Sequence, residues 1–264
     1  MYEYSMKKIG IIGAGNMGGA FYKALAGKFE ENALRVFDRN NEKLKNLNVK
    51  KIVESVDELV KNSDVIILAV KPQVCDDLFS KISVETKEKL VISIMAGVSV
   101  AKLKDLSGSS RVVRAMPNLG VQIKKGVTGW FASEEVTSED KKIANKIFEA
   151  GGESIEVESE KMINPLTAIS GSGPAYFFYL TEMLQKKAES LGFSAEDAKK
   201  MAEVTFVGSA ELFAGSNKSA EEWRQAVSSK GGSTVEAINH MQENKFAEIF
   251  GEAIEKAKKR WEDL

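Results

Sequence analysis

At 264 residues the chain is long enough for two domains, and its net charge of −1, spread along the sequence, does not favour nucleic acid or an acidic membrane as a partner. One Cys and one His exclude an internal disulfide and a Cys/His zinc site, and they disfavour hydrolysis by a histidine-activated nucleophile. No apolar run approaches the roughly 18 residues of a membrane span. We therefore expect a cytoplasmic protein with no membrane partner and no metal.

The first predicted element is a buried strand at residues 9–12, which leads through Gly13, Gly15 and Gly18 into a segment of helical period. Residues 1–5, before Met6, are expected to form a loose extension. A G-x-G-x-x-G loop between a strand and a helix is typical of dinucleotide binding. Its first glycine permits the turn, the second lets the backbone approach a pyrophosphate, and the third lets the helix pack on the strand. The alternative is that these glycines only make a tight turn.

The second predicted strand, at residues 34–37, ends at Asp38, where this fingerprint places a ribose contact. A carboxylate there would accept from the ribose 2′-hydroxyl and repel a 2′-phosphate, which favours NADH. Arg39 and Asn40 would instead bind that phosphate, which favours NADPH. These residues leave the choice of cofactor open.

Further strands are predicted at residues 65–70, 90–94 and 111–115, with helical patterns between them, as in a doubly wound parallel sheet. Two more, at 128–131 and 154–157, are expected at the edge, and the helix between them is capped at Thr137 or Ser138. In such sheets, ligands lie beyond the carboxyl ends of the strands. The strand ends that we expect to face the cofactor are Ala69, Val70, Lys71, Pro72, Ala96, Gly97 and Asn118.

Beyond about residue 158 the pattern is helical throughout, and a long helix is expected to begin near Gly173 and Pro174. The sequence thus predicts a Rossmann-type, mostly parallel α/β domain at 1–159 and an all-α domain at 160–264. The long helix is apolar round more than one face, so it needs a second partner. We expect a homodimer formed through the helical domain.

A glycine-rich loop precedes one of these helices and ends in Gly231, Gly232, Ser233 and Thr234. Exposed N–H groups and hydroxyls at a helix N-terminus hold an anion, and one such site suits a substrate carboxylate. On this stretch alone, an ordinary glycine-rich helix cap explains the residues equally well.

Taken together, these motifs resemble the pyrroline-5-carboxylate reductases from about Met6 onward. The stretches that carry the resemblance are Ile12-Gly13-Ala14-Gly15-Asn16-Met17, Ala69-Val70-Lys71-Pro72-Gln73, Ser93-Ile94-Met95-Ala96-Gly97-Val98, Arg114-Ala115-Met116-Pro117-Asn118, Ser170-Gly171-Ser172-Gly173-Pro174-Ala175-Tyr176 and the loop at 228–234. The resemblance implies reduction of the C=N bond of a cyclic imino acid to L-proline. The family's usual cofactor favours NADPH, with NADH left open, and its members are dimers that often assemble into rings of dimers.

The resemblance also implies roles for individual residues. The expected cofactor contacts are Ile12, Gly13, Ala14, Gly15, Asn16, Met17, Val70, Lys71, Pro72, Ala96 and Gly97. The substrate carboxylate is expected on Gly231, Gly232, Ser233 and Thr234, with the Thr234 hydroxyl, the catalytic candidate, near the imine nitrogen. Glu160 matches an acidic residue on the substrate side.

The sequence departs from the family pattern at four places, which are Val56, Leu119-Gly120, Ala226 and Lys230. Two other functions are alternatives. A hydroxyacid dehydrogenase would need a catalytic Lys, with an Asn four residues on, in the long helix, and the first Lys there is Lys186, followed by Ser190. The second alternative is a dimer that senses the nucleotide without turnover. Only a turnover assay distinguishes it from a reductase.

Overall fold

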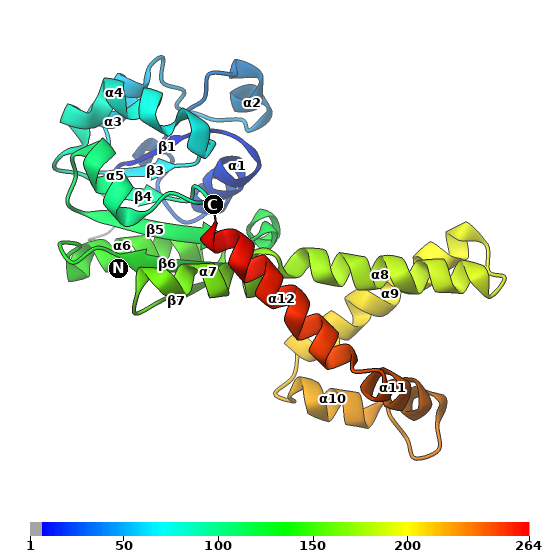
Figure 1. Ribbon diagram of the computed structural model, residues 1–264. Helices are drawn as coiled ribbons and strands as arrows, with labels where there is room; N and C mark the ends of the chain where they lie inside the picture. Colours follow the sequence, from blue (N-terminus) through cyan, green and yellow to red (C-terminus); the bar gives the residue numbers. More distant parts are fainter. Residues whose placement is uncertain (1–6, 264) are drawn as a thin grey trace. The chain divides into compact units, whose positions relative to one another are not determined.

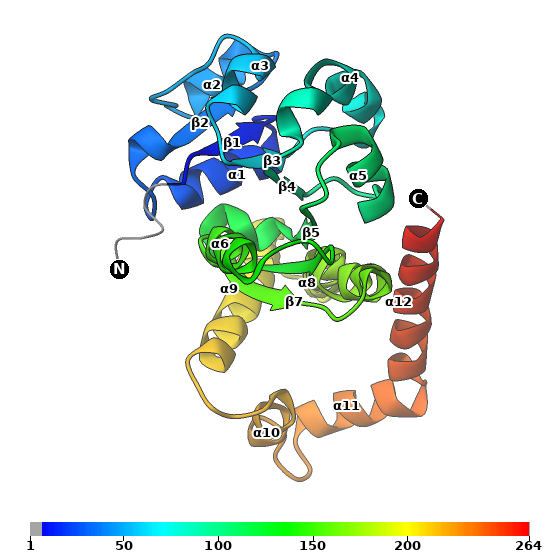
Figure 2. The same ribbon diagram turned by 90° about the vertical axis from the view of Figure 1, so that its left-hand side faces the viewer.

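The computed structural model describes residues 7–263, so the extension expected at residues 1–5 lies outside the described part. The chain divides into two compact units. Unit 1 contains the described residues up to Ser172 and those from Lys258 onward, and unit 2 contains Gly173–Ala257. Figure 1 and Figure 2 show the elements of both units. Each unit is described by itself below. The domain boundary expected between residues 159 and 160 remains a prediction.

Unit 1 is built on one sheet, which in the described residues has seven strands in the order β2-β1-β3-β4-β5-β6-β7. The strands are β1 (Ile9–Ile12), β2 (Leu34–Phe37), β3 (Val65–Leu68), β4 (Leu90–Ser93), β5 (Val112–Pro117), β6 (Gly126–Ala132) and β7 (Gly152–Glu156). The strands β1 to β5 pair in parallel, β6 is antiparallel to β5, and β7 is parallel to β6. The predicted doubly wound, mostly parallel sheet is confirmed.

One detail of the predicted sheet is wrong. The strand expected at 128–131 is not an edge strand, because β6 lies between β5 and β7 and only β7 forms that edge. Thr128 and Trp130 of this strand are buried.

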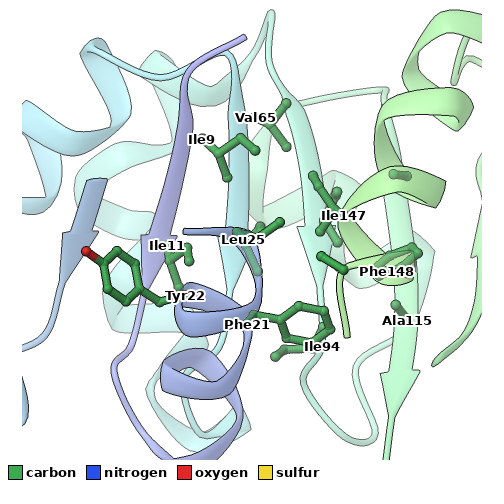
Figure 3. Packing of buried hydrophobic residues seen from close by; sticks show 14 of the residues in the cluster. Ile9, Ile11, Phe21, Tyr22, Leu25, Val65, Ile94, Ala115, Ile147 and Phe148 are labelled. Carbon is green, nitrogen blue, oxygen red and sulfur yellow. The ribbon is translucent and has the colours of Figure 1, made fainter. Parts of the chain in front are cut away.

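Helices cover both faces of the sheet, which explains why β1, β3 and β4 are buried along their whole length. The helices of unit 1 are α1 (Asn16–Leu25), α2 (Asn41–Asn46), α3 (Val56–Lys61), α4 (Cys75–Thr86), α5 (Val100–Ser107), α6 (Ser138–Glu149) and α7 (Ile163–Leu166). One apolar cluster joins α1 and α6 to the sheet, with Phe148 within 6.3 Å of Phe21 and 5.7 Å of Trp130 between ring centroids. Figure 3 shows part of this cluster. A second cluster, on the opposite face, packs α3, α4 and α5 (Figure 2).

Side-chain caps set where several of these helices begin. Thr137 caps α6 and Asp140 returns the contact, which forms a full capping box and decides between the two expected caps. Ser55 caps α3 by accepting from the N–H of Glu58, but the carboxylate of Glu58 accepts from the N–H of Glu54 rather than from Ser55. Residues 55–58 therefore form only half of a capping box.

Unit 2 contains helices, and no strand is found among its residues. The helices are α8 (Gly173–Ser190), α9 (Ala195–Ala214), α10 (Ala220–Ala226), α11 (Ser233–Glu243) and α12 (Phe246–Glu262), of which the last ends in unit 1. Phe177 of α8 packs on Phe206 of α9, and Tyr176 meets Phe250 of α12 edge to face. In the part of the chain that the structure describes, none of the helices has the length and apolarity to cross a bilayer.

Large apolar side chains of unit 2 remain exposed in one copy of the chain, although they lie on the long helices. On α8 and α9 they are Phe177, Phe178, Tyr179, Leu180, Met183, Leu184, Met201, Val204, Val207, Leu212 and Phe213. Monomeric proteins rarely expose so large an apolar surface. We call this set the α8–α9 apolar face.

Candidate functional site

A cavity of about 550 Å³ opens at the carboxyl ends of β1, β2 and β3, where ligands bind in parallel sheets. A volume of this size is typical of a pocket for a cofactor or another small molecule. The lining residues are Ile12, Gly13, Gly15, Phe37, Asp38, Arg39, Lys43, Glu54, Ser55, Val56, Asp57, Ala69, Val70, Lys71, Val74 and Leu78. We call it the cofactor cavity.

The three glycines of this motif, Gly13 and Gly15 in the loop after β1 and Gly18 in the first turn of α1, have different surroundings. A Cβ on Gly13, at φ +105°, would lie 2.5 Å from the carbonyl oxygen of Ala69, and one on Gly18 would lie 2.0 Å from that of Gly13. Around a Cβ on Gly15, no atom of the described residues lies within 4 Å. Gly13 and Gly18 are therefore required by the turn and by close packing, whereas Gly15 leaves open space.

The start of α1 suits the phosphates of a dinucleotide. Gly15 is the N-cap residue, and α1 begins without a side-chain cap from any described residue. Its first N–H groups and the positive end of the helix dipole therefore remain available to an anion. The open space at Gly15 lies on the cofactor cavity, so the residues present fit a dinucleotide cofactor.

Asp38 lies at the end of β2 and binds the protein's own backbone. Its Oδ2 accepts from the N–H of Ala14 at 2.7 Å, and its Oδ1 accepts from the N–H of Asn40 at 2.8 Å. The Nζ of Lys43 is 3.5 Å from Oδ2. Arg39 is an exposed neighbour that pairs with Asp77 of α4 at 2.7 Å.

The structure brings part of the predicted cofactor contacts together. Those that line the cofactor cavity are Ile12, Gly13, Gly15, Asp38, Arg39, Ala69, Val70 and Lys71. A neighbouring cavity of about 360 Å³ is lined by Ala14, Gly15 and Asn16, among others. The predicted contacts that do not line either cavity, among the residues described, are Met17, Asn40, Pro72, Ala96, Gly97 and Asn118. The role of every one of these residues stays a prediction.

Asn118 has a structural role that sequence reasoning missed. Its Oδ1 accepts from the N–H groups of Gly120 and Val127, at 3.1 and 3.0 Å, and its Nδ2 donates to the carbonyl of Ser170 at 3.1 Å. Ser170 belongs to a π-helical turn at Thr167–Gly171. Asn118 therefore ties the end of β5 to β6 and to this turn.

Several residues of the cofactor cavity were not predicted as contacts. Lys43 stands in the first turns of α2, and Val74 and Leu78 follow the motif that starts at Ala69. Residues 54–57 also line the cavity, although the sequence marks only Val56 among them, as a departure from the family pattern. These residues reach the cavity because α2, α3 and α4 return to the sheet edge, and no local sequence pattern marks that return.

The loop before α11 has the backbone that an anion site needs. Gly231 has φ +74°, the N–H of Gly232 donates to the carbonyl of Ser229 at 2.9 Å, and Gly232 is the N-cap of α11. The helix starts at Ser233 without a side-chain cap from any described residue. Lys230 is exposed beside this loop. An uncapped helix start of this kind can bind a carboxylate. This supports the predicted substrate contacts of Gly231, Gly232, Ser233 and Thr234, which remain predictions.

Glu160 belongs to unit 1 and has partners there. Its Oε1 accepts from the N–H of Val100, at the start of α5, and from Nη1 of Arg114, both at 2.8 Å. The Arg114 side chain is 9% exposed and its Nε is without a partner among the described residues. Glu160 therefore stabilises a buried arginine and the start of a helix, and its predicted contact with substrate remains a prediction.

The single Cys and His lie outside these sites. Cys75 is fully buried at the start of α4, and burial raises the pKa of its thiol. His240 is exposed on α11, next to Asn244. Among the residues described, no group of three or more His, Cys, Asp and Glu side chains is arranged to hold a metal ion.

Two family models match the chain. Residues 160–264 match the model for pyrroline-5-carboxylate reductase dimerisation, and residues 8–97 match the model described as NADP oxidoreductase, coenzyme F420-dependent. The first covers the helices of unit 2 and Glu160, and the second covers the strands and loops that form the cofactor cavity.

The similarity to individual reductases extends over nearly the whole chain. Pyrroline-5-carboxylate reductase 2 of Bacillus subtilis is 32% identical over 262 residues, which cover 97% of this chain and 94% of that protein. The solved structure of a pyrroline-5-carboxylate reductase from Coxiella burnetii is 34% identical with a TM-score of 0.91, and covers 97% of this chain and 98% of that one. The Plasmodium falciparum pyrroline carboxylate reductase, solved with NADP bound, is 29% identical with a TM-score of 0.82 and covers 97% of each chain.

Proposed function

Because the chain belongs to the pyrroline-5-carboxylate reductase family, we propose that it reduces the C=N bond of 1-pyrroline-5-carboxylate to L-proline, using NADPH. The observation that carries this proposal is the match to named reductases over nearly the full length, which includes both candidate binding loops. The reaction is the last step of proline biosynthesis, and we place it in the cytoplasm.

The cofactor cavity would hold NADPH, which supplies the hydride when bound. The open side of Gly15 and the uncapped start of α1 would receive the pyrophosphate, and Asp38, Arg39 and Lys43 surround the adenosine end. Use of the 2′-phosphorylated cofactor is supported by the NADP oxidoreductase model and by the neighbour solved with NADP.

The substrate carboxylate would bind the loop before α11. The N–H groups of Ser233 and Thr234 and the dipole of α11 would provide a positive partial charge at the start of this helix. Gly231, at φ +74°, allows the loop to turn. The hydroxyl of Thr234 would hold the imine nitrogen and its proton. A hydroxyl is a weak acid, so we assign Thr234 a positioning role.

The chemistry suits the residues of this chain. A protonated imine already carries the positive charge that attracts a hydride, so it needs alignment more than a strong general acid. A carbonyl reductase would need a proton donor such as Lys, His or Tyr. The only His of the sequence, His240, is an exposed helix residue, which fits imine reduction better.

The α8–α9 apolar face would pair with the same face of a second copy. A dimer about a twofold axis buries such a surface once and closes the assembly. The match of this region to a dimerisation model supports the homodimer.

The deciding experiment follows oxidation of NADPH, and separately of NADH, at about 340 nm when 1-pyrroline-5-carboxylate is added to purified protein. We expect rapid, substrate-dependent consumption of NADPH and formation of proline. Tight NADPH binding without turnover would contradict the proposal and favour the nucleotide-sensing dimer. A control with 2-oxo acids in place of the imine tests whether a carbonyl is reduced instead.

A further inference from the structure

The second cavity of unit 1, of about 360 Å³, has no role in the proposed function. Its walls come from α1, from α2 and from a 3₁₀ turn, η3 (Leu119–Ile123). Only Gly15 and Lys43 line both this cavity and the cofactor cavity. Apart from Lys43 and the glycine loop, its lining residues are Gly19, Ala20, Lys23, Asn46, Leu47 and Gln122. We call it the α1–α2 cavity.

The lining of the α1–α2 cavity follows α1 for two turns. Gly15, Gly19 and Lys23 are each four residues apart, so they lie on one face of the helix. The rise of about 1.5 Å per residue places Lys23 about 12 Å along the axis from Gly15. A Cβ on Gly19 would lie 3.1 Å from the side chain of Leu47, so this glycine allows α1 and the end of α2 to approach closely. The cavity is therefore elongated and is not confined to the start of α1.

The lining carries positive charge and no acid. Lys23 and Lys43 are both exposed, and neither Asp nor Glu is found among the described residues that line the cavity. Lys23 has no acidic partner in the described part of the chain, and the Nζ of Lys43 lies 3.5 Å from the Asp38 carboxylate. Side-chain amides supply further N–H donors, and they belong to Asn16, Asn46 and Gln122.

The two cations mark opposite ends of the cavity. Lys43 lies where the α1–α2 cavity adjoins the cofactor cavity, because it lines both. Lys23 belongs to the last turn of α1. A ligand with negative charge at one point only would meet one of these cations, whereas a linear ligand with negative groups along its length would meet both.

We propose that the α1–α2 cavity is a second ligand site, which binds a linear polyanion of the polyphosphate class between Lys43 and Lys23. Lysine binds phosphate as a point charge, and the amides donate to the remaining phosphate oxygens. Arginine, whose planar fork suits carboxylates, is not among the described lining residues. The site lies beyond the proposed function, since most of its residues do not line the cofactor cavity.

The test titrates inorganic triphosphate by calorimetry into protein that is saturated with NADPH, so that the cofactor cavity is occupied. We expect one triphosphate per chain with a Kd of about 1 mM or lower at low ionic strength. Lys23→Ala should weaken triphosphate binding about tenfold, and Gln122→Glu, which adds a negative charge, at least as much. Both variants should keep the Kd for NADPH within about twofold of wild type, because neither residue lines the cofactor cavity.

Lys45→Ala is the matched control, since Lys45 is an exposed cation of α2 that lines neither cavity. It should leave the affinity for triphosphate unchanged. Adipate, a linear dicarboxylate, tests the class of ligand and should bind at least about tenfold more weakly than triphosphate.

Four results would overturn the proposal. They are the absence of triphosphate binding to the NADPH-saturated protein, an unchanged affinity in Lys23→Ala, an equal loss in Lys45→Ala and Lys23→Ala, and adipate binding as tight as that of triphosphate. The first would mean that triphosphate enters the cofactor cavity only, and the third that it senses diffuse surface charge. If Gln122→Glu does not fold, Lys23→Ala decides. All of these are binding measurements, so a chain that does not reduce the imine refutes the proposed function and leaves this test intact.

Discussion

Arg114 is a buried cation that pairs with Glu160, the carboxylate for which the family resemblance implies a contact with substrate. Its side chain is 9% exposed, and Glu160 supplies an acceptor at 2.8 Å. The same oxygen accepts from the N–H of Val100 at the start of α5, and α5 follows the turn that contains Ala96 and Gly97. Loss of this carboxylate would leave a buried charge without its partner, which costs more than the pair contributes.

We predict that Glu160→Ala lowers the free energy of unfolding by about 2–3 kcal/mol, below the value for a fully buried pair because Glu160 is partly exposed. Glu160→Gln keeps one acceptor and should lose about half as much. Urea unfolding without ligands measures both. If Glu160 contacts the substrate instead, Glu160→Gln will raise the KM for pyrroline-5-carboxylate while the stability stays unchanged.

Thr234 is the residue whose loss should separate binding from turnover. We predict that Thr234→Ala lowers kcat by about 10- to 100-fold, the equivalent of one hydrogen bond to a charged group, and leaves the Kd for NADPH unchanged. Thr234→Ser keeps the hydroxyl and is the matched control, expected within a few-fold of wild type. Full turnover in Thr234→Ala would remove this hydroxyl from the mechanism.

At the scale of elements, Gly15, the N-cap residue of α1, and Gly18, in the first turn of that helix, meet different requirements. A Cβ on Gly18 would lie 2.0 Å from the carbonyl oxygen of Gly13 and 2.8 Å from the Cβ of Ala69, so a glycine there lets α1 approach the strands. Gly15 has the dihedral angles φ −70° and ψ −171°, which any residue adopts, and open space at its Cβ position. The fold therefore does not require a glycine at position 15, and we attribute it to the proposed cofactor contact.

We predict opposite outcomes for Gly15→Ala and Gly18→Ala. Gly15→Ala should keep the unfolding temperature within a few degrees and weaken NADPH binding about tenfold or more, because its methyl occupies the space above the helix start. Gly18→Ala should destabilise the protein by about 1–3 kcal/mol or more, because backbone must move. Gly19→Ala, whose Cβ would meet only the Leu47 side chain, is the control. A stable Gly15→Ala variant with normal affinity would contradict the assignment.

The strands β1, β3 and β4 could be predicted because each is a short, fully buried and mainly apolar run. The hydrogen-bond partners of the polar side chains that follow the strands could not be predicted from the sequence. Asp38 accepts from Ala14, a residue 24 positions away, and Asn118 accepts from Val127 and donates to Ser170. These partners depend on how the loops return to the sheet edge, which hydrophobic periodicity does not encode. The glycine-rich loops could be predicted from the sequence because the backbone conformation that requires glycine is a local property.

At the scale of the whole molecule, unit 2 is the part in which a single chain leaves a large apolar surface exposed. Its long helices pack on each other, yet the α8–α9 apolar face remains exposed along both. Burying such a face contributes about 25 cal/mol for each Å² of apolar surface, and leaving it in water promotes association. The proposed homodimer would bury this surface, which lies on the helix that the sequence marks as apolar on more than one side.

We predict that the wild-type chain is a dimer or a multiple of it at micromolar concentration, and that Tyr179→Arg disrupts the dimer. Tyr179 is 62% exposed in one copy, so a charge there costs little in the monomer but must be desolvated in the interface. A loss of about 2 kcal/mol or more corresponds to at least a 30-fold rise in the dissociation constant. Size-exclusion chromatography with light scattering measures it.

Ile123→Arg is the control for that prediction, because Ile123 is an exposed apolar residue of unit 1 and lies outside the α8–α9 apolar face. It should leave the oligomer intact. NADPH binding by the Tyr179→Arg chain shows that the cofactor cavity in unit 1 is still folded, since that cavity is lined by residues of unit 1 alone. A monomeric wild-type chain, or a Tyr179→Arg variant that elutes with it as a dimer, would contradict the assignment of this face.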